Sequence, residues 1–194
     1  SHVDRAIHGA DECIISNVLG TNVLLEKART SGVSKFIQVS TDEVYGSIQE
    51  GSFDEESVLA PNSPYSASKA AAEHMCRAYF VTFGLPVVIT RSSNNFGPYQ
   101  YPEKFVALSI TNLIEGKKIP LYGDGKNVRD WLYVEDNCDG IYFVLNKGAA
   151  GEVYNIAGGY EMMNIDMVHD ILKAMAKDGS MVEYVKDRLG HDRR

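Results

Sequence analysis

The sequence predicts an α/β protein with a mainly parallel sheet flanked by helices, followed by a smaller second α/β lobe. Apolar runs of strand length alternate with longer segments whose apolar residues recur at helical spacing. The segment Pro86–Thr90 is apolar throughout, which is typical of a strand covered on both faces in a parallel sheet. The alternation breaks near residue 97, where the motif FGPYQYPEK contains two prolines, and we place the lobe boundary there, giving lobes 1–97 and 98–194.

Start and stop signals support the elements of the first lobe. Ser63 can cap a helix whose first position suits Pro64, and Gly32 and Gly84 are helix stops. The expected elements are a helix over 4–31, a strand over 35–40, a loop over 46–63, a helix over 64–83 and a strand over 86–90.

The second lobe is predicted to have shorter and more irregular elements, some of which return to the first sheet. Gly116 is the stop of its first helix. The expected elements are a helix over 103–115, short strands, a helix over 135–146, a strand over 153–156, a helix over 165–177 and a strand over 182–185.

Composition narrows the class of protein. The chain has 194 residues, 44% of them hydrophobic, which suffices for one sizeable core or two small lobes. The formal net charge of -7 argues against a protein that wraps nucleic acid. No apolar run reaches the roughly 18 residues of a membrane span, and no signal-peptide pattern is present, so no membrane association is expected.

Cysteines and histidines give no sign of a metal site. Cys13, Cys76 and Cys138 lie far apart in apolar, helix-like patterns, which predicts buried free thiols in a reducing compartment, the cytoplasm. The histidines lack metal-ligand spacing, so we expect no metal and interpret four of them as structural: His2, His8, His74 and His169.

Tyr65 and Lys69 stand four residues apart on a predicted helix, a spacing that puts both side chains on one face. A nearby ammonium favours the phenolate, so we expect the pair to act as a base toward an alcohol. Such pairs are also common on exposed helix faces without any function, so the pair alone is weak support.

Thr41, Asp42 and Glu43 follow directly after a predicted strand. Residues at the carboxyl ends of parallel strands line the ligand crevice, so the Thr41 hydroxyl and the Tyr65 pair could meet at one substrate oxygen. The adjacent acids have two readings: a solvated turn, or a site that needs an acid and a base with separated pKa values.

Several segments resemble the extended short-chain dehydrogenase/reductase superfamily, and within it the dTDP-glucose 4,6-dehydratases. They run from the first residue to the last, in order: SHVDRAI, VSTDEVYG, PYSASKAAAEH, RSSNNFGPYQYPEKF, IPLYGDGKNVRDWLYVED, GEVYNIAGG and DRLGHDRR. The Tyr-x3-Lys motif is shared by the whole superfamily. The Thr-Asp-Glu triplet is more specific, because most relatives, 4-epimerases included, lack the adjacent acids.

The resemblance implies an NAD-dependent lyase that oxidises C4 of a nucleotide-linked glucose, eliminates water across C5 and C6, and returns the hydride to C6. It implies that Tyr65 takes the C4 hydroxyl proton beside Lys69 and that Thr41 holds that oxygen. Glu43 would remove the C5 proton as general base while Asp42 protonates the departing C6 hydroxyl.

The resemblance also implies two sets of binding residues. The cofactor set comprises Ser1, Asn17, Ser40, Tyr65, Lys69 and Asn95. The substrate set comprises Asn94, Lys104, Tyr122, Arg129, Asn164, Arg188 and His191. The guanidinium groups of Arg129 and Arg188 suit bidentate contact with phosphate, although both arginines could instead form weak surface ion pairs. We expect Trp131 to be a core residue rather than a stacking platform.

The sequence departs from the family by lacking a Gly-rich phosphate-binding turn, and Leu189 stands where relatives commonly have Pro. We therefore expect an internal portion of a longer protein: residues 1–97 from the later part of a Rossmann-type NAD-binding domain, and 98–194 mainly from the lobe that binds the nucleotide sugar. Relatives imply a homodimer through a four-helix bundle of helices near 5–30 and 64–83.

Two other classes of function stay open. The first is another enzyme of the superfamily, such as a 4-epimerase, a decarboxylase, or a dehydratase acting on a GDP-sugar or UDP-sugar; the acid pair argues against an epimerase. The second is a non-catalytic nucleotide-binding sensor or scaffold. The presence of the full Thr41, Asp42, Glu43, Tyr65 and Lys69 set favours catalysis.

Overall fold

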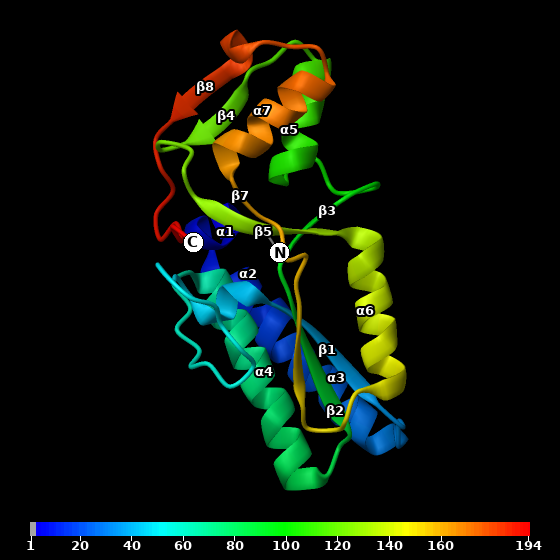
Figure 1. The fold of residues 1–194 in the computed structure, drawn as a ribbon. Helices are drawn as coiled ribbons and strands as arrows, with labels where there is room; N and C mark the ends of the chain where they lie inside the picture. The colour runs from blue at the N-terminus through cyan, green and yellow to red at the C-terminus, as the bar shows by residue number, and fades with distance from the viewer. Residues whose placement is uncertain (1–2) are drawn as a thin grey trace.

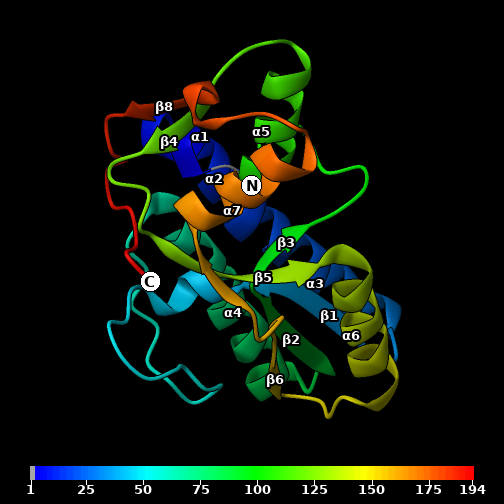
Figure 2. The ribbon, with the colours of Figure 1, turned by 45° about the horizontal axis from the view of Figure 1, so that its top comes forward.

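The computed structural model describes residues 3–194, and a three-stranded parallel sheet forms its centre. The strands are β1 (Phe36–Thr41), β2 (Val87–Ser92) and β6 (Val153–Ile156), in the order β1-β2-β6. Figure 1 labels β1 and β2, and Figure 2 also labels β6. Every residue of β2 is buried because this strand lies between its two neighbours, with helices on both faces. The predicted α/β class with a Rossmann-type parallel sheet is confirmed.

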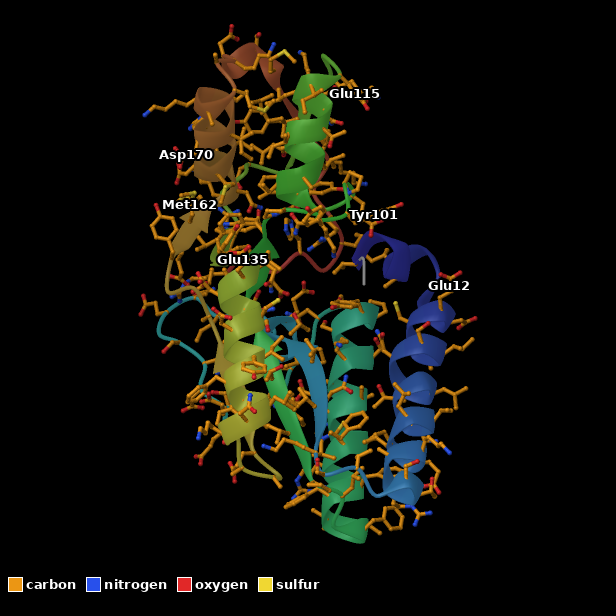
Figure 3. All side chains as sticks on the ribbon, turned by 90° about the vertical axis from the view of Figure 1, so that its right-hand side faces the viewer. Glu12, Tyr101, Glu115, Glu135, Met162 and Asp170 are labelled. Atoms are coloured by element: carbon orange, nitrogen blue, oxygen red, sulfur yellow. The ribbon has the colours of Figure 1, made fainter. Side chains whose placement is uncertain are left out.

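Helices cover both faces of this sheet. Figure 3 shows α3 (Gly20–Ser31) and α4 (Pro64–Phe83) on one face and α6 (Val134–Lys147) on the other. The core between α3, α4 and the sheet consists of Leu25, Ala28, Cys76, Tyr79, Leu85, Val87 and Ile89. Burial of these side chains fixes α4 beside β1 and β2, which determines where the first turns of α4 lie.

The N-terminal helical segment is interrupted, whereas the sequence predicts one helix. It consists of α1 (Val3–His8), α2 (Ala10–Cys13), the π-helix η1 (Ile14–Leu19) and α3. Gly9 has φ -162°, far from helical values, and ends α1. The predicted stop at Gly32 is confirmed: its φ of 63° is left-handed, which glycine adopts without a steric penalty.

Helix α4 begins and ends where the sequence predicts. The Ser63 hydroxyl accepts a hydrogen bond from the Ser66 N–H at 3.1 Å, and the Ser66 hydroxyl accepts one from the Ser63 N–H at 3.1 Å. This reciprocal pair is a capping box, and Pro64 occupies the first turn. Gly84 ends the helix with φ 68°.

The second lobe has its own core. Strands β4 (Ile119–Tyr122) and β8 (Val182–Val185) pair in parallel, and α5 (Phe105–Ile114), α7 (Asn164–Ala174) and the short η3 (Gly179–Met181) complete the lobe. Its buried cluster consists of Leu113, Ile119, Leu121, Val168, Ile171 and Leu172. The predicted strand over 182–185 is confirmed, and the predicted helices 103–115 and 165–177 begin or end one to three residues from the observed ones.

A small sheet connects the two lobes. Strand β3 (Asn94–Phe96) pairs in parallel with β5 (Val128–Tyr133), which pairs antiparallel with β7 (Glu161–Met163). Figure 2 shows β3 and β5 between the lobes. Because β3 follows β2 after one residue, the chain passes directly from the central sheet to this junction.

Two further features concern possible membrane spans and the burial of the cysteines. No helix within residues 3–194 is long and apolar enough to cross a membrane. The three cysteines are free, but only Cys76 is buried; Cys13 is half-buried and Cys138 is exposed. The expectation of three buried thiols is therefore wrong for Cys138, because its position on α6 faces solvent.

Leu113→Ala should lower the free energy of unfolding by about 2–5 kcal/mol, because the truncation leaves a cavity in the second core. Urea denaturation followed by circular dichroism measures this loss. The matched control is Ile114→Ala in the same helix, whose side chain is 72% exposed and whose truncation should change stability by no more than about 0.5 kcal/mol. Equal losses in the two variants would contradict this description of the core.

Candidate active site

Two adjoining cavities lie where β1 and β2 end. The first has a volume of about 270 Å³ and is lined by Thr41, Asp42, Glu43 and Tyr65 together with residues 92–95. The second has a volume of about 390 Å³ and extends into the second lobe. Glu43, Asn94 and Lys104 line both cavities, so one ligand could occupy the two together.

The triplet Thr41-Asp42-Glu43 sits at the start of a short 3-10 helix, η2 (Asp42–Tyr45). Thr41 caps this helix: its hydroxyl accepts a hydrogen bond from the Glu43 N–H at 3.3 Å. The same hydroxyl donates to the Asp42 carboxyl at 3.2 Å. The strand end, the cap and the helix together direct both acids to the wall of the first cavity, so the solvated-turn reading is wrong.

Burial raises the pKa values of both acids, and the charges near each acid separate their behaviour. The pKa of Asp42 is raised to about 7, first by burial and then by the neighbouring Glu43 carboxylate. Burial also raises the pKa of Glu43, but nearby Arg188, Arg129 and Lys104 oppose that rise by favouring the charged form. Near neutral pH, Asp42 is therefore a credible proton donor, and Glu43 has cations nearby that favour its carboxylate.

The Tyr65 phenol differs from the expectation. Its pKa is raised above the usual value by burial and then by Glu43 and Asp42, rather than lowered by Lys69. The physical reason is that Lys69 Nζ donates a hydrogen bond to the Val39 carbonyl at 2.7 Å, while the phenol shares its cavity with two carboxyl groups. Burial lowers the pKa of Lys69 itself.

Several residues that line the first cavity carry a buried polar atom with no hydrogen-bond partner among residues 3–194. These atoms are the Ser40 hydroxyl, the Asn95 amide oxygen, the Gln100 amide oxygen and the Trp131 ring nitrogen. The side-chain nitrogens of Asn95 and Gln100 are occupied, since they donate to the Ser93 and Asn95 carbonyls at 3.0 and 2.7 Å. Unpaired buried polar atoms are costly, and a polar ligand in this cavity would satisfy them.

The remaining members of the predicted cofactor set lie at the edge of the site or beyond the described residues. The Asn17 amide donates a hydrogen bond to the Ser68 hydroxyl at 2.9 Å, which ties η1 to the first turns of α4. Ser1 lies outside the described residues, as does His2.

The structure brings the whole predicted substrate set together around the second cavity, which is lined by Asn94, Lys104, Tyr122, Arg129, Asn164, Arg188 and His191. Burial lowers the pKa of Arg129, and its guanidinium donates to the Val128 carbonyl at 2.7 Å. His191 pairs with Asp187 at 2.7 Å, and its ring is 6% exposed. These residues form a basic wall within an acidic protein.

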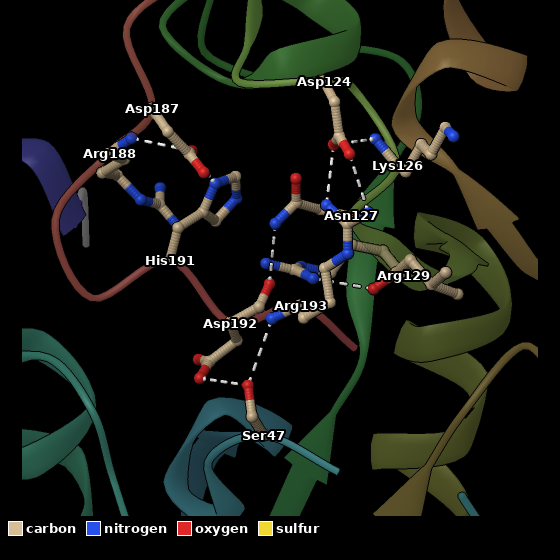
Figure 4. A network of polar contacts seen from close by, with 11 residues as sticks. Ser47, Asp124, Lys126, Asn127, Arg129, Asp187, Arg188, His191, Asp192 and Arg193 are labelled. Carbon is tan, nitrogen blue, oxygen red and sulfur yellow. Dashed lines mark hydrogen bonds and ion pairs between the residues drawn. The ribbon is translucent and has the colours of Figure 1, made fainter. Parts of the chain in front are cut away.

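The C-terminal segment 187–194 fastens this wall to both lobes, as Figure 4 shows. The Asp192 carboxylate accepts hydrogen bonds from Ser47 at 2.8 Å and Asn62 at 2.7 Å. Arg193 pairs with Asp124 at 2.7 Å, in the turn that follows β4. Arg188 and His191 are thereby held between the loop after η2 and the second lobe.

Sequence reasoning missed several residues of the site. Gln100 and Asn137 line the first cavity, and Asp187 orients His191. The spacing of four residues between Asp187 and His191 was one available signal. Trp131 is a core residue as predicted, 6% exposed and packed on Phe105 with ring centroids 6.1 Å apart, yet it also lines both cavities.

The chain is similar to several known nucleotide-sugar enzymes. A dTDP-glucose 4,6-dehydratase of Actinoplanes sp. is 49% identical over the whole chain, which covers 61% of that relative. The crystal structure of the dTDP-glucose 4,6-dehydratase DesIV from Streptomyces venezuelae, with NAD and TYD bound, has a TM-score of 0.99 and 52% identity; all of this chain is covered and 60% of that one. A UDP-glucuronic acid 4-epimerase from Bacillus cereus has a TM-score of 0.87 and 31% identity over 92% of this chain and 57% of that one.

The chain thus spans about 60% of the length of the dTDP-glucose 4,6-dehydratases that it matches. These relatives confirm the resemblance to dTDP-glucose 4,6-dehydratases and to the extended short-chain dehydrogenase/reductase superfamily. The model of the family described as GDP-mannose 4,6 dehydratase matches residues 1–193. The chain belongs to this family.

Proposed function

We propose that the protein is an NAD-dependent dTDP-glucose 4,6-dehydratase, a hydro-lyase that converts dTDP-glucose to dTDP-4-keto-6-deoxyglucose. The observation that carries this proposal is the half-buried acid pair Asp42 and Glu43, which shares one cavity with Thr41 and Tyr65. The names of the relatives support it: several that are about half identical to this chain are dTDP-glucose 4,6-dehydratases, and the DesIV structure contains NAD and TYD.

The first cavity suits the nicotinamide end of NAD. A carboxamide carries both donors and an acceptor, which complement the unpartnered Ser40 hydroxyl and Asn95 amide oxygen. When bound, NAD supplies the acceptor of the C4 hydride and the donor that later reduces C6. We assign cofactor contacts to Ser1, Asn17, Ser40, Tyr65, Lys69 and Asn95.

Oxidation at C4 requires removal of a hydroxyl proton. We assign Tyr65 as the base that takes it, with Thr41 holding the same oxygen from the opposite wall. Lys69, one helical turn after Tyr65, donates a hydrogen bond to the Val39 carbonyl, and we assign it to the same step, although burial and the two acids raise the pKa of Tyr65.

Elimination of water requires an acid and a base on one sugar. A C4 ketone acidifies the proton at C5, and we assign Glu43 as the base that removes it. Asp42, whose pKa of about 7 leaves a substantial fraction protonated near neutral pH, donates its proton to the C6 hydroxyl, which leaves as water. When C6 is reduced, Glu43 returns its proton to C5, so the sugar loses one water and gains no net oxidation.

The two lobes divide binding between them. We assign residues 1–97 to the cofactor domain and 98–194 mainly to the nucleotide-sugar lobe, with β6 returning to the first sheet. Arg129 and Arg188 lie on the wall of the second cavity, where guanidinium groups suit the diphosphate. Asn94, Lys104, Tyr122, Asn164 and His191 complete this wall.

Turnover of dTDP-glucose by the full-length protein tests the function. With NAD present, mass spectrometry should detect a product lighter than the substrate by one water, and Glu43→Gln should lower kcat by on the order of 100-fold or more while substrate still binds. GDP-glucose and UDP-glucose serve as competing substrates. If no nucleotide-linked glucose loses water, the dehydratase proposal is wrong; preference for GDP-glucose would replace the assigned nucleotide.

The kcat of the enzyme should depend on the protonation of Asp42. Only the neutral carboxyl can donate a proton, so kcat should fall as the pH rises through about 7, by about tenfold for each pH unit well above it, while protonation of the base Glu43 limits kcat on the acid side. Steady-state rates at saturating dTDP-glucose measure this limb of the profile, and Asp42→Asn should abolish the limb together with most of the activity. A wild-type kcat that stays constant well above this pH would remove Asp42 from its role.

We propose a homodimer formed through η1, α3 and α4. Large apolar side chains of η1 and α3 are exposed: Ile14 52%, Ile15 59%, Leu19 55%, Val23 58% and Leu24 61%. Such a contiguous apolar surface is typical of a protein interface. No contact with nucleic acid or membrane is proposed.

Leu24→Glu should convert the dimer to a monomer, because it places a charge on this apolar surface. Sedimentation of the full-length protein measures the mass in solution. The matched control is Leu189→Glu, 73% exposed in the C-terminal segment, which should leave the dimer intact. A wild-type protein that sediments as a monomer at micromolar concentration would overturn the dimer proposal.

We also propose that the enzyme works in the cytoplasm, in keeping with its three free cysteines. Cell fractionation with an antibody against the protein tests this, and recovery of the protein outside the cytoplasmic fraction would contradict it.

A further inference from the structure

The proposed mechanism leaves unused a buried ion pair beneath the active site. Arg91 is 6% exposed and Glu73 3% exposed. The guanidinium makes two close contacts with Glu73 Oε2, 2.7 Å from Nη2 and 3.0 Å from Nε. Burying two charges carries a large desolvation cost, which such a pair offsets only with good geometry and further hydrogen bonds. Replacement of such a pair by hydrophobic residues of similar volume is often neutral or stabilising, so a buried pair is weak support for a purely stabilising role.

The further hydrogen bonds connect the pair to Tyr45. Arg91 Nη1 donates to the Tyr45 hydroxyl at 2.6 Å and to the Glu55 carbonyl at 3.2 Å. The Tyr45 hydroxyl in turn donates to the Asn155 side-chain oxygen at 2.8 Å. Tyr45 is 2% exposed, and its ring stacks on Phe53 with centroids 4.9 Å apart. Every strong donor of this cluster therefore has a partner.

Each charged or hydroxyl member of this cluster lies on an element that carries active-site residues. Tyr45 is the last residue of η2, two positions after Glu43. Glu73 lies one helical turn after Lys69 on α4. Arg91 belongs to β2 and directly precedes the residues of this strand that line the first cavity. The cluster thus joins three elements: η2, which carries the acid pair, α4, which carries Tyr65 and Lys69, and β2, whose last residue lines the first cavity.

We propose that Tyr45, Arg91 and Glu73 are positioning residues that fix the acid pair of η2 relative to Tyr65 and Lys69. This inference rests on the proposed function, since it assigns the two pairs to successive steps on one sugar. The helix η2 has only four residues: Thr41 caps its first end, and Tyr45 anchors its last through Arg91. Misplacement of reacting groups by about 1 Å can cost on the order of 100-fold in rate.

The hydrogen bond between Arg91 and the Tyr45 hydroxyl should affect the rates of oxidation and elimination differently. Thr41 is held in β1 and Tyr65 in the capped start of α4, so oxidation at C4 depends little on the Tyr45 hydroxyl. Asp42 and Glu43 belong to η2 itself, so elimination depends on it directly. Loss of the hydroxyl should therefore slow elimination more than oxidation.

Tyr45→Phe in the full-length protein with NAD tests the proposal, because it removes the hydroxyl and keeps the stacked ring. We expect kcat for dTDP-glucose to fall about tenfold, corresponding to about 1.4 kcal/mol, with KM changed less than about twofold. Rapid quench should show the 4-keto hexose accumulating before elimination. Arg91→Lys, which keeps the charge opposite Glu73 but lacks the guanidinium fork, should show the same accumulation.

The matched control is Tyr79→Phe on α4, which removes a hydroxyl that donates to Asn22 at 3.1 Å away from the cavities. It should not accumulate the 4-keto hexose. The positioning role is overturned if Tyr45→Phe keeps wild-type kcat, or if oxidation and elimination slow equally in step with a lowered Tm, because a purely structural role predicts the latter.

A structural measurement separates this inference from the proposed function. If wild-type protein does not convert dTDP-glucose, the function fails, and crystal structures of wild type and Tyr45→Phe then decide the positioning role. A displacement of η2 relative to α4 by more than about 0.5 Å supports it, whereas coincident η2 helices overturn it.

Discussion

The parallel pairing of β1 with β2 is the constraint on which the site depends. Their register sets Phe36 opposite Val87 and Thr41 opposite Ser92, so the two strands end at the same edge of the sheet. Strands in a parallel sheet point the same way, and whatever follows them emerges side by side. The acid-bearing helix η2 and the Asn94–Asn95 segment of β3 are neighbours for this reason alone.

Burial then gives the groups at this edge their chemistry. The same low-dielectric surroundings raise the pKa values of Asp42, Glu43 and Tyr65, while nearby cations oppose the rise for Glu43. Two carboxyl groups of similar intrinsic acidity are thereby given different tendencies to hold a proton. The second lobe provides those cations, because Arg129 and Arg188 reach the junction from β5 and the C-terminal segment.

The polar contacts of the C-terminal segment and the buried Arg91–Glu73 pair have different roles around the site. The Asp192, Arg193 and Asp187 contacts lie near the surface, where each ion pair contributes little, and together they locate the C-terminal segment across both lobes. The Arg91–Glu73 pair is almost fully buried, so its geometry is much harder to change.

The sequence by itself determined the local elements and the chemical types. Helix α4 was predictable to the residue because Ser63, Pro64 and Gly84 are local signals. The apolar run at 86–90 indicated β2 but not its end, since the strand continues through the polar residues Arg91 and Ser92. The sequence also supplied Thr41, Asp42, Glu43, Tyr65 and the basic wall through their resemblance to a family. The break at Gly9 and the π-turn in η1 were not predictable, because apolar spacing alone does not distinguish a straight helix from an interrupted one.

Only the tertiary structure decided which environment each group has. The raised pKa of Tyr65, the hydrogen bond from Lys69 to Val39 and the exposure of Cys138 depend on residues far away in the sequence. The same is true of the cluster of Tyr45, Glu73 and Arg91, whose members come from three different elements. Spacing along a chain fixes which side chains share a face, whereas burial and charge depend on which faces the fold brings together.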